Sequence, residues 1–347
     1  MTFVYVSNAE DGDIGMYRLN PDGSLRPGER FKAGKSLGPM SVSPDRRFLV
    51  AAVRAQPYLA YSFTIEGKSG ALAPVGSGPL AESLPYITFD RTGRYLLGAS
   101  YSAHLVSVNP VGADGKVGAP QQVIPTARNA HAIITDKTNR FAFVPHLGTD
   151  QVFQFLFDEK SGRLSANTPP VLQLKAGSGP RHLITSPDNR FVYLLNELTA
   201  TVSTLALDSK NGILSETSSA SSLPRDSKLG PGMPRPQQGR DVGNDIWASD
   251  IHVTPDGRFL YAAERTSSTL NAFRVMAEGR LEYLFSMATE KQPRGFRIDP
   301  TGRFMVVSGE KSGTLSTYAI ESNGQLRLVG KYPTGKGSNW VEIVSFD

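Results

Sequence analysis

Short apolar runs separated by polar turns dominate the chain. The stretch 179–197, GPRHLITSPDNRFVYLLNE, shows the pattern: an apolar run, a turn that ends in Asn189-Arg190-Phe191, a second apolar run, and then Asn196-Glu197. Apolar runs bounded by Pro, Gly, Asn and Asp are typical of β-strands joined by tight turns. The stretch therefore predicts a β-hairpin with polar residues at its open end.

The same layout recurs along the whole chain. Six turns share its form: Pro44-Asp45-Arg46-Arg47-Phe48, Arg91-Thr92-Gly93-Arg94-Tyr95, Lys137-Thr138-Asn139-Arg140-Phe141, Pro187-Asp188-Asn189-Arg190-Phe191, Pro255-Asp256-Gly257-Arg258-Phe259 and Pro300-Thr301-Gly302-Arg303-Phe304. The arginine before the aromatic residue recurs at intervals of 47, 46, 50, 68 and 45 residues. Four of these intervals fit one four-stranded propeller blade of roughly 40–50 residues.

The two ends of the chain complete one further unit. Residues 340–346 have the pattern of a first strand, and residues 2–7, 14–19 and 25–32 have the pattern of the second, third and fourth. Joined in one blade, these strands would close the ring and leave no free edge. We therefore predict an all-β, seven-bladed β-propeller, a single domain over 1–347, closed by N- and C-terminal strands that share one blade.

The interval of 68 residues contains an insertion at about 217–244. It includes the run LPRDSKLGPGMPRPQQGRDVG, which is rich in Pro, Gly and charged residues and has almost no apolar periodicity. Such a composition predicts an irregular loop. The loop enters just before the strand of Asp250, where it can reshape the mouth of the ring.

Composition excludes several classes of protein. The chain of 347 residues has no cysteine, so it forms no disulfide, thiolate zinc site or cysteine nucleophile. The first residues, MTFVYVSNAEDG, lack the basic and apolar segments of a signal peptide, which leads us to expect a cytoplasmic protein. No apolar stretch approaches the ~20 residues needed to cross a bilayer, so we expect no membrane association.

The formal net charge is +5. Nucleic-acid binding is one interpretation of a basic chain. The basic residues are spread along the sequence, however, without a Lys/Arg run that is interleaved with aromatic residues. We therefore predict no nucleic-acid partner, and we expect a small anionic substrate, which explains a mild positive excess equally well.

Equivalent positions of the repeat carry most of the candidate chemistry. The first strand of each propeller blade lines the central channel, so equivalent side chains point toward one pocket. These positions lie nine and eight residues before the shared arginine, and six and seven residues after it. They hold the ionisable or polar residues Arg54, His131, Arg181, His182, Asn196, Glu197, Asp250, Glu264, Arg265, Arg294 and Glu310, and Trp340 is their C-terminal equivalent. We expect a charged rim on one face of the ring, with ion pairs between blades as the alternative use of these groups.

These residue types suit the chemistry of an ester-like ring. Arginines can hold a carboxylate or phosphate and can steady an oxyanion. Glu197 or His131 can take a proton from water. A carboxylate crowded among arginines tends to stay ionised, which suits a base. Hydrolysis or closure of a lactone in an anionic substrate follows as the predicted reaction.

Metal binding is the main rival use of the histidines. His131, His182 and His252 lack close spacing and fit no ligand motif, so we predict no metal and no other cofactor. His252 is expected to be a hydrogen-bonded structural residue, and His104 and His146 to be surface or packing residues. No Gly-Xaa-Ser-Xaa-Gly elbow or phosphate-binding glycine loop is evident, which disfavours a serine hydrolase or a nucleotide enzyme.

Five segments together resemble a known family. The segments 179–182 (GPRH), 196–198 (NEL), 247–258 (WASDIHVTPDGR), 264–266 (ERT) and 292–296 (QPRGF) are similar to those of the bacterial cycloisomerase-2 type 6-phosphogluconolactonases. These are seven-bladed propellers related to the fungal carboxymuconate lactonizing enzyme. The resemblance covers nearly the whole chain and implies a cofactor-independent enzyme that acts on the lactone of an acidic or phosphorylated substrate.

The resemblance also implies roles for individual residues. By segment match, the catalytic residues are His131, Arg181, Glu197 and Arg265. The remaining repeat positions are the predicted substrate-binding residues, namely Arg54, His182, Asn196, Asp250, Glu264, Arg294, Glu310 and Trp340.

Three functions stay open at this point. The first is hydrolysis of a sugar-acid lactone, 6-phosphogluconolactone before others. The second is a lactonase or lactonizing step on an unphosphorylated carboxylated lactone of muconate or aldaric type. The third, which we rank lowest because the repeat positions are ionic and not apolar, is a non-enzymatic platform for protein interactions. The sequence leaves the oligomeric state and the choice between His131 and Glu197 as base undecided.

Overall fold

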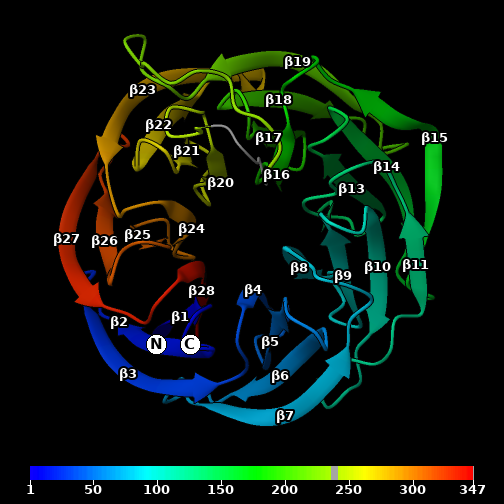
Figure 1. Ribbon diagram of the computed structural model, residues 1–347, viewed down its shortest axis with the longest axis vertical. Coiled ribbons are helices and arrows are strands. Elements are labelled where there is room, and N and C mark those ends of the chain that lie inside the picture. Colours follow the sequence, from blue (N-terminus) through cyan, green and yellow to red (C-terminus); the bar gives the residue numbers. More distant parts are fainter. Residues whose placement is uncertain (236–240, 347) are drawn as a thin grey trace.

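Seven four-stranded antiparallel sheets surround one axis in the computed structural model, which describes residues 1–235 and 241–346 (Figure 1). This confirms the predicted seven-bladed β-propeller. Within each sheet the strands follow one another from the channel outwards.

Six of the blades each come from one continuous stretch of chain. The first three are β4 (Leu37–Val42), β5 (Phe48–Val53), β6 (Leu59–Ile65) and β7 (Leu72–Pro79); β8 (Tyr86–Phe89), β9 (Tyr95–Ser100), β10 (Leu105–Pro110) and β11 (Gln122–Pro125); β12 (Ile134–Thr135), β13 (Phe141–His146), β14 (Gln151–Asp158) and β15 (Arg163–Gln173). The next three are β16 (Pro180–Thr185), β17 (Phe191–Asn196), β18 (Thr201–Leu207) and β19 (Leu214–Ser221); β20 (Ala248–Val253), β21 (Phe259–Glu264), β22 (Thr269–Val275) and β23 (Leu281–Ala288); β24 (Pro293–Ile298), β25 (Phe304–Gly309), β26 (Thr314–Ile320) and β27 (Leu326–Pro333). A 3-10 turn, Ala277–Gly279, precedes β23.

The seventh blade joins the two ends of the chain. Its strands are β28 (Ser338–Ser345), β1 (Thr2–Asn8), β2 (Asp13–Leu19) and β3 (Leu25–Lys32), in that order from the channel. β1 and β28 are antiparallel, with Thr2 opposite Ser345 and Ser7 opposite Trp340. The predicted closure by strands from both ends is therefore confirmed.

The repeated turn fastens each blade to the next. Arg140 shows how: its guanidinium carbon lies 4.9 Å from the ring centre of Phe141, and it donates a hydrogen bond of 2.6 Å to the carbonyl of Ser209 in the following blade. The same following turn contains Gly212 at φ +73°, where an added Cβ would lie 2.1 Å from the Phe141 ring. The shared arginine, the aromatic residue and the glycine thus form one contact, which explains why all three recur in the sequence.

The apolar cores lie between neighbouring blades. One cluster joins Phe143 and Val152 of the β12–β15 blade to Leu194 and Leu205 of the β16–β19 blade, all of them fully buried. Six of the seven second strands are buried along their whole length, because blades cover both of their faces. This burial accounts for their continuous apolar runs.

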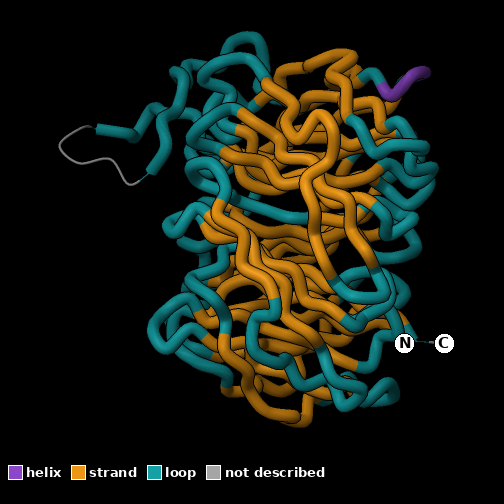
Figure 2. The backbone as a smooth tube through the Cα atoms, turned by 90° about the vertical axis from the view of Figure 1, so that its right-hand side faces the viewer, coloured by secondary structure: helices purple, strands orange, loops and turns teal. Residues whose placement is uncertain are grey.

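The insertion stands out from one face of the ring (Figure 2). β19 continues to Ser221, since residues 218–221 pair with β18 and Thr217 lies in a bulge of the strand, so the irregular segment begins at 222 and not at 217. Residues 236–240 of the predicted loop lie outside the described residues. Its described part is held to the ring by the Gly232 N–H, which donates to the carbonyl of Leu198 at 2.8 Å.

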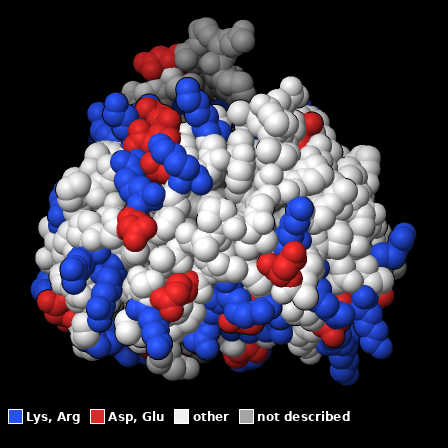
Figure 3. All heavy atoms as spheres, turned by 90° about the horizontal axis from the view of Figure 1, so that it is seen from below, with Lys and Arg blue, Asp and Glu red and all other residues white. Residues whose placement is uncertain are grey.

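Charged side chains of both signs are interspersed over the side of the ring shown in Figure 3. No helix in residues 1–235 and 241–346 has the length and apolar character needed to cross a membrane.

Candidate active site

A recurring hydrogen bond brings the repeat positions together at one mouth of the channel. The residue that follows the second strand of a blade donates its N–H to a carbonyl just ahead of the first strand. Glu197 does so to Gly179 at 2.7 Å, and Arg54 does so to Ser36 at 3.1 Å. The same bond recurs for Arg265 and Glu310. Side chains from different blades therefore lie at the same level along the axis.

Bulges at the start of four inner strands turn further side chains toward the channel. The pairing register shifts between Leu37 and Met40, Pro180 and His182, Ala248 and Ile251, and Pro293 and Gly295. In a regular strand the neighbours Arg181 and His182 would point to opposite faces. A bulge inserts one extra residue and so changes the direction of the side chains around it, and bulges are common next to active sites.

A cavity of about 490 Å³, the mouth cavity, lies on the face that carries the insertion. Most of its walls come from residues at or next to the ends of first or second strands, and the rest come from the insertion. The lining residues are Arg54, Pro85, Tyr101, His131, Glu197, Arg235, Val242, Trp247, Arg265 and Arg294. Three of the four predicted catalytic residues are among them.

Glu197 is held by two arginines from two blades. Its Oε2 lies 2.8 Å from Nε of Arg181 and 2.9 Å from Nη2 of Arg265. Burial, reinforced by the mutual repulsion of the two guanidiniums and opposed by Glu197, lowers the pKa of Arg181 to about 9. Burial likewise lowers the pKa of Arg265 to about 10, again against the attraction of Glu197. Both arginines are therefore charged at neutral pH, with one carboxylate between them.

Arg181 lies behind this carboxylate and does not line the mouth cavity. It is 1% exposed and donates a hydrogen bond from Nη1 to the carbonyl of Ser249 in the neighbouring blade. Arg265 does line the cavity, and its Nε and Nη2 also donate to the carbonyls of Trp247 and Ala248. Arg265 is thus fixed from three sides, which is the rigidity expected of a group that stabilises developing charge.

His131 is an uncharged imidazole in the wall of the cavity. Burial first, and then the positive charge of Arg181, hold its pKa well below the usual value for histidine. Its ring contacts those of Tyr101 and His182 edge-on, with centroid distances of 5.7 Å and 5.2 Å. Its buried Nδ1 has no hydrogen-bond partner within the described part of the chain. A neutral imidazole beside cationic groups can accept a proton and, once protonated, is a strong acid.

Arg54 and Arg294 lie between the mouth cavity and a neighbouring hollow of about 580 Å³, the side cavity. Arg294 pairs with Glu310 at 3.0 Å, and Glu310 lines the side cavity. Burial and the nearby charge of Arg294 lower the pKa of Arg54 to about 10. The structure therefore brings three of the predicted substrate-binding residues to the mouth of the ring.

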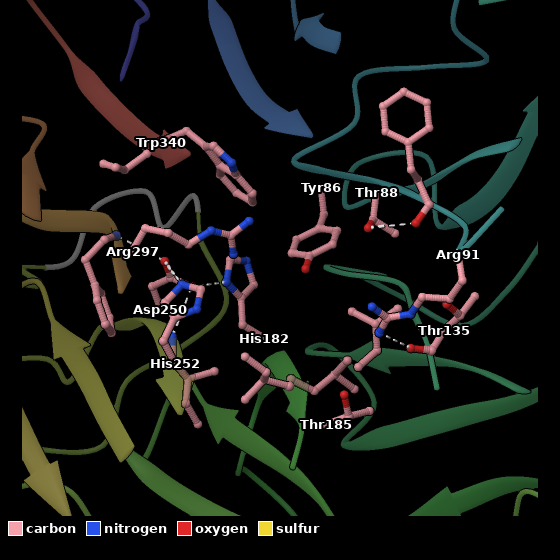
Figure 4. Close-up of a pocket in the computed structure, with 17 residues that line it drawn as sticks. Tyr86, Thr88, Arg91, Thr135, His182, Thr185, Asp250, His252, Arg297 and Trp340 are labelled. Carbon is pink, nitrogen blue, oxygen red and sulfur yellow. Dashed lines mark hydrogen bonds and ion pairs between the residues drawn. The ribbon is translucent and has the colours of Figure 1, made fainter. Parts of the chain in front are cut away.

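Three other predicted substrate-binding residues lie deeper, in a channel cavity of about 220 Å³ (Figure 4). His182 Nδ1 is 3.0 Å from Asp250, which also contacts His252 Nε2 at 3.2 Å. The two backbone N–H groups of Ile251 and Phe296 donate to the same carboxylate. Trp340 lies in the wall of this cavity, and its indole N–H donates to Glu342.

Asn196 and Glu264 have their polar atoms directed elsewhere. Asn196 donates to Thr201 and Ser203 within its own blade. Glu264 is fully buried and accepts from the N–H of Trp247 and from Ser267. Asn196 thus links β17 to β18, and Glu264 ties the residues that flank β20 and β21 to their blade.

Five residues of the mouth cavity were not candidates in the sequence, and three of them carry polar or aromatic side chains. Tyr101 occupies a repeat position but is uncharged. Trp247 lies outside the four repeat positions, which are nine and eight residues before the shared arginine and six and seven residues after it. Arg235 belongs to the insertion, where no repeat register exists. The guanidinium carbons of Arg265 and Arg235 lie 3.7 Å and 3.9 Å from the Trp247 ring centre, and this aromatic contact is visible only in three dimensions.

No group of three or more His, Asp or Glu side chains in residues 1–235 and 241–346 is arranged to hold a metal ion.

Comparison with known proteins places the chain among similar sequences and folds. The model of the family described as lactonase, 7-bladed beta-propeller, matches residues 3–343. A 6-phosphogluconolactonase of Serratia proteamaculans (strain 568) is 36% identical over 99% of this chain and 98% of its own length. One of Pectobacterium carotovorum subsp. carotovorum (strain PC1) is 35% identical over 99% of both chains. The solved structure of the periplasmic gluconolactonase of Pseudomonas aeruginosa covers 99% of each chain with a TM-score of 0.86 and 27% identity.

Proposed function

The chain belongs to the family of seven-bladed β-propeller lactonases, and from that premise we propose that it hydrolyses a sugar-acid lactone, 6-phosphogluconolactone before others. One observation carries the proposal: a neutral His131 and a charged Arg265 line the same cavity, with Glu197 holding the arginine in place. Water activation and oxyanion stabilisation need such a pair of groups. The names of the two bacterial relatives point to the same substrate.

In the first step His131 acts as the base. It takes a proton from a water molecule as the water oxygen attacks the lactone carbonyl carbon. The carbonyl oxygen becomes an oxyanion, which the guanidinium of Arg265 stabilises. Arg265 suits this role because its Nε and Nη2 are held by fixed acceptors, so the group needs no rearrangement as the negative charge develops.

In the second step the tetrahedral intermediate collapses. The bond between the carbonyl carbon and the ring oxygen breaks, and the imidazolium of His131 returns its proton to that oxygen. The products are a carboxylic acid, which ionises, and a free hydroxyl group, and the enzyme is restored. The positive groups around His131 favour this proton return because they make the imidazolium a stronger acid.

Glu197 supports both steps as a fixed carboxylate. Its Oε2 accepts a hydrogen bond from Nη2 of Arg265 and forms an ion pair with Nε of Arg181, so it balances part of their charge and fixes the direction of Arg265. We assign the base to His131 and the positioning role to Glu197 and Arg181. This chemistry uses only groups of the chain and needs no cofactor.

A second candidate is a lactone that carries a carboxylate and no phosphate. The same arginines would hold it, and the similar P. aeruginosa protein is named a gluconolactonase. The reverse reaction, ring closure, would use the same groups. An interaction platform ranks lowest, because four arginines and one glutamate are among the residues that line the cavity.

A pH-stat measurement tests the proposal. Purified protein is assayed with 6-phosphogluconolactone, gluconolactone and muconolactone, with spontaneous hydrolysis subtracted. Turnover of 6-phosphogluconolactone with the highest kcat/KM is expected. No turnover of any lactone would overturn the assignment. A cytoplasmic location stays a prediction that cell fractionation can check.

A further inference from the structure

The described part of the insertion reaches over the mouth of the ring. It leaves β19 and returns to β20, in two neighbouring blades. The carbonyl of its Arg235 nevertheless accepts a hydrogen bond of 2.8 Å from the hydroxyl of Tyr101, which follows β9, two blades away from β19 around the ring. Burial raises the pKa of the Tyr101 phenol to about 12, so this group remains a donor at neutral pH.

A stacked contact fixes the other end of Arg235. Its guanidinium carbon lies 3.9 Å from the Trp247 ring centre, while that of Arg265 lies 3.7 Å from the ring. Two planar cations cannot both occupy the space directly above one face, so the indole separates them. Contacts of this kind attract each cation to the ring. Arg235 is therefore held over the mouth cavity and not free in solvent.

The charges that line the mouth cavity do not balance. Four arginines and one glutamate face it. Arg265 pairs with Glu197, and Arg294 pairs with Glu310. Arg54 and Arg235 have no carboxylate partner among residues 1–235 and 241–346, and Nε of Arg54 is buried without any hydrogen-bond partner there.

The two unpaired guanidiniums come from different parts of the fold. Arg54 follows β5, and its blade is separated from the blade of Glu197 by two blades on one side and three on the other. It therefore stands across the ring from Glu197, while the insertion places Arg235 beside Trp247. Both guanidiniums line the same cavity as His131 and Glu197, so a ligand that fills this cavity from its carbonyl outwards would meet them.

We propose that Arg235 is a specificity-determining residue, which forms with Arg54 a subsite for the anionic substituent that the lactone carries away from its carbonyl carbon. The inference rests on the proposed function for the identity of the lactone. A phosphate monoester suits the subsite best, because its oxygens and near double charge match two guanidiniums. The subsite explains why the insertion enters beside this cavity.

The experiment compares Arg235→Gln with Arg225→Gln, a matched change in the insertion at a residue that does not line the cavity. We expect R235Q to raise KM for the phosphorylated lactone roughly 10- to 100-fold, as loss of a charge-assisted hydrogen bond predicts. Its kcat/KM for unphosphorylated gluconolactone, which carries no anionic substituent, should fall much less than its kcat/KM for the phosphorylated lactone. R225Q should match the wild-type protein with both substrates. Equal KM values for R235Q and R225Q would overturn the proposal.

A binding measurement separates this inference from the proposed function. Inorganic phosphate should raise the melting temperature of the wild-type protein and of R225Q, and should have little effect on R235Q. If no lactone is hydrolysed but this difference appears, the reaction is wrong and the subsite stands. If phosphate shifts no melting temperature, or shifts that of R235Q as much as that of the wild-type protein, the subsite is refuted whatever the activity.

Discussion

Arg265 and Glu197 meet across the boundary between two blades, with 2.9 Å between Nη2 and Oε2. Each lies directly after the second strand of its own blade, so the same repeat position supplies both members of the pair. Both side chains are at most 5% exposed. The ion pair that positions Arg265 in the site therefore also joins two neighbouring blades.

Replacement of Glu197 should damage activity and stability together. Glu197→Gln leaves two buried guanidiniums without their counter-charge, so we expect the free energy of unfolding to fall by about 3–5 kcal/mol. We also expect kcat/KM to fall at least about 100-fold, because Arg265 loses its fixed direction. Denaturant unfolding and the lactone assay measure the two effects.

Glu310→Gln is the control for this change. Glu310 pairs with one arginine, and its side chain is 17% exposed, so its loss should cost less stability. An E197Q protein that is as stable and as active as E310Q would contradict the role given to the pair.

The pH dependence of the reaction should reveal His131. Its pKa is lowered, so the unprotonated base persists below the usual range of histidine. We expect kcat/KM to be flat from neutral pH to well below 6.5 and to fall only when the pH drops through the lowered pKa. His131→Gln should abolish the enzymatic rate. A wild-type profile that already falls by half near the usual histidine pKa of about 6.5 would argue against a buried, uncharged His131.

Asp250 should matter more for folding than for turnover. Asp250→Asn weakens contacts with two histidines and two backbone N–H groups in the channel, so we expect a loss of about 2–4 kcal/mol in unfolding free energy. Because the residue lies below the mouth cavity, kcat/KM should change less than about threefold. A loss of activity as large as that of E197Q, at unchanged stability, would place Asp250 in the reaction instead.

Substitutions at two glycines should distinguish the energetic cost of backbone strain from the cost of a steric clash. Gly212 and Gly177 have similar positive φ angles, +73° and +77°, but an added Cβ meets the Phe141 ring only at Gly212 and meets nothing within 4 Å at Gly177. Gly177→Ala should cost about 1–2 kcal/mol of unfolding free energy. Gly212→Ala should cost a further ~1–3 kcal/mol because the ring must move. Equal costs would mean that Phe141 relaxes freely.

The sequence was informative about the fold because each blade repeats the same turn. Arg140, Phe141 and Gly212 recur as types because each blade makes the same contact with the next one. The closing blade was predictable as well, since the two ends supply complementary parts of one unit. The start of the irregular segment was less certain, because the polar residues 217–221 form the outer end of β19.

The site was harder to predict because the spacing of residues along the sequence does not show how deep a side chain lies in the channel or which way it points. Arg181 and His182 are adjacent in sequence, yet one supports the mouth cavity and the other lines the channel cavity, since a bulge lies between them. Asn196 precedes Glu197, but its amide turns toward its own blade. Arg235 has no repeat position at all. Local backbone irregularity and the path of the insertion decide these three cases.

The closing blade also sets how the protein responds to a pulling force. Thr2 lies opposite Ser345, so both chain ends leave the ring at the same end of one antiparallel pair (Figure 1). Tension between them would act across the strands and break the hydrogen bonds one pair at a time, as in a zipper, instead of loading all of them at once. The pair that contains Trp340 would open near the end of this process. The channel wall would thus survive partial peeling of the ring.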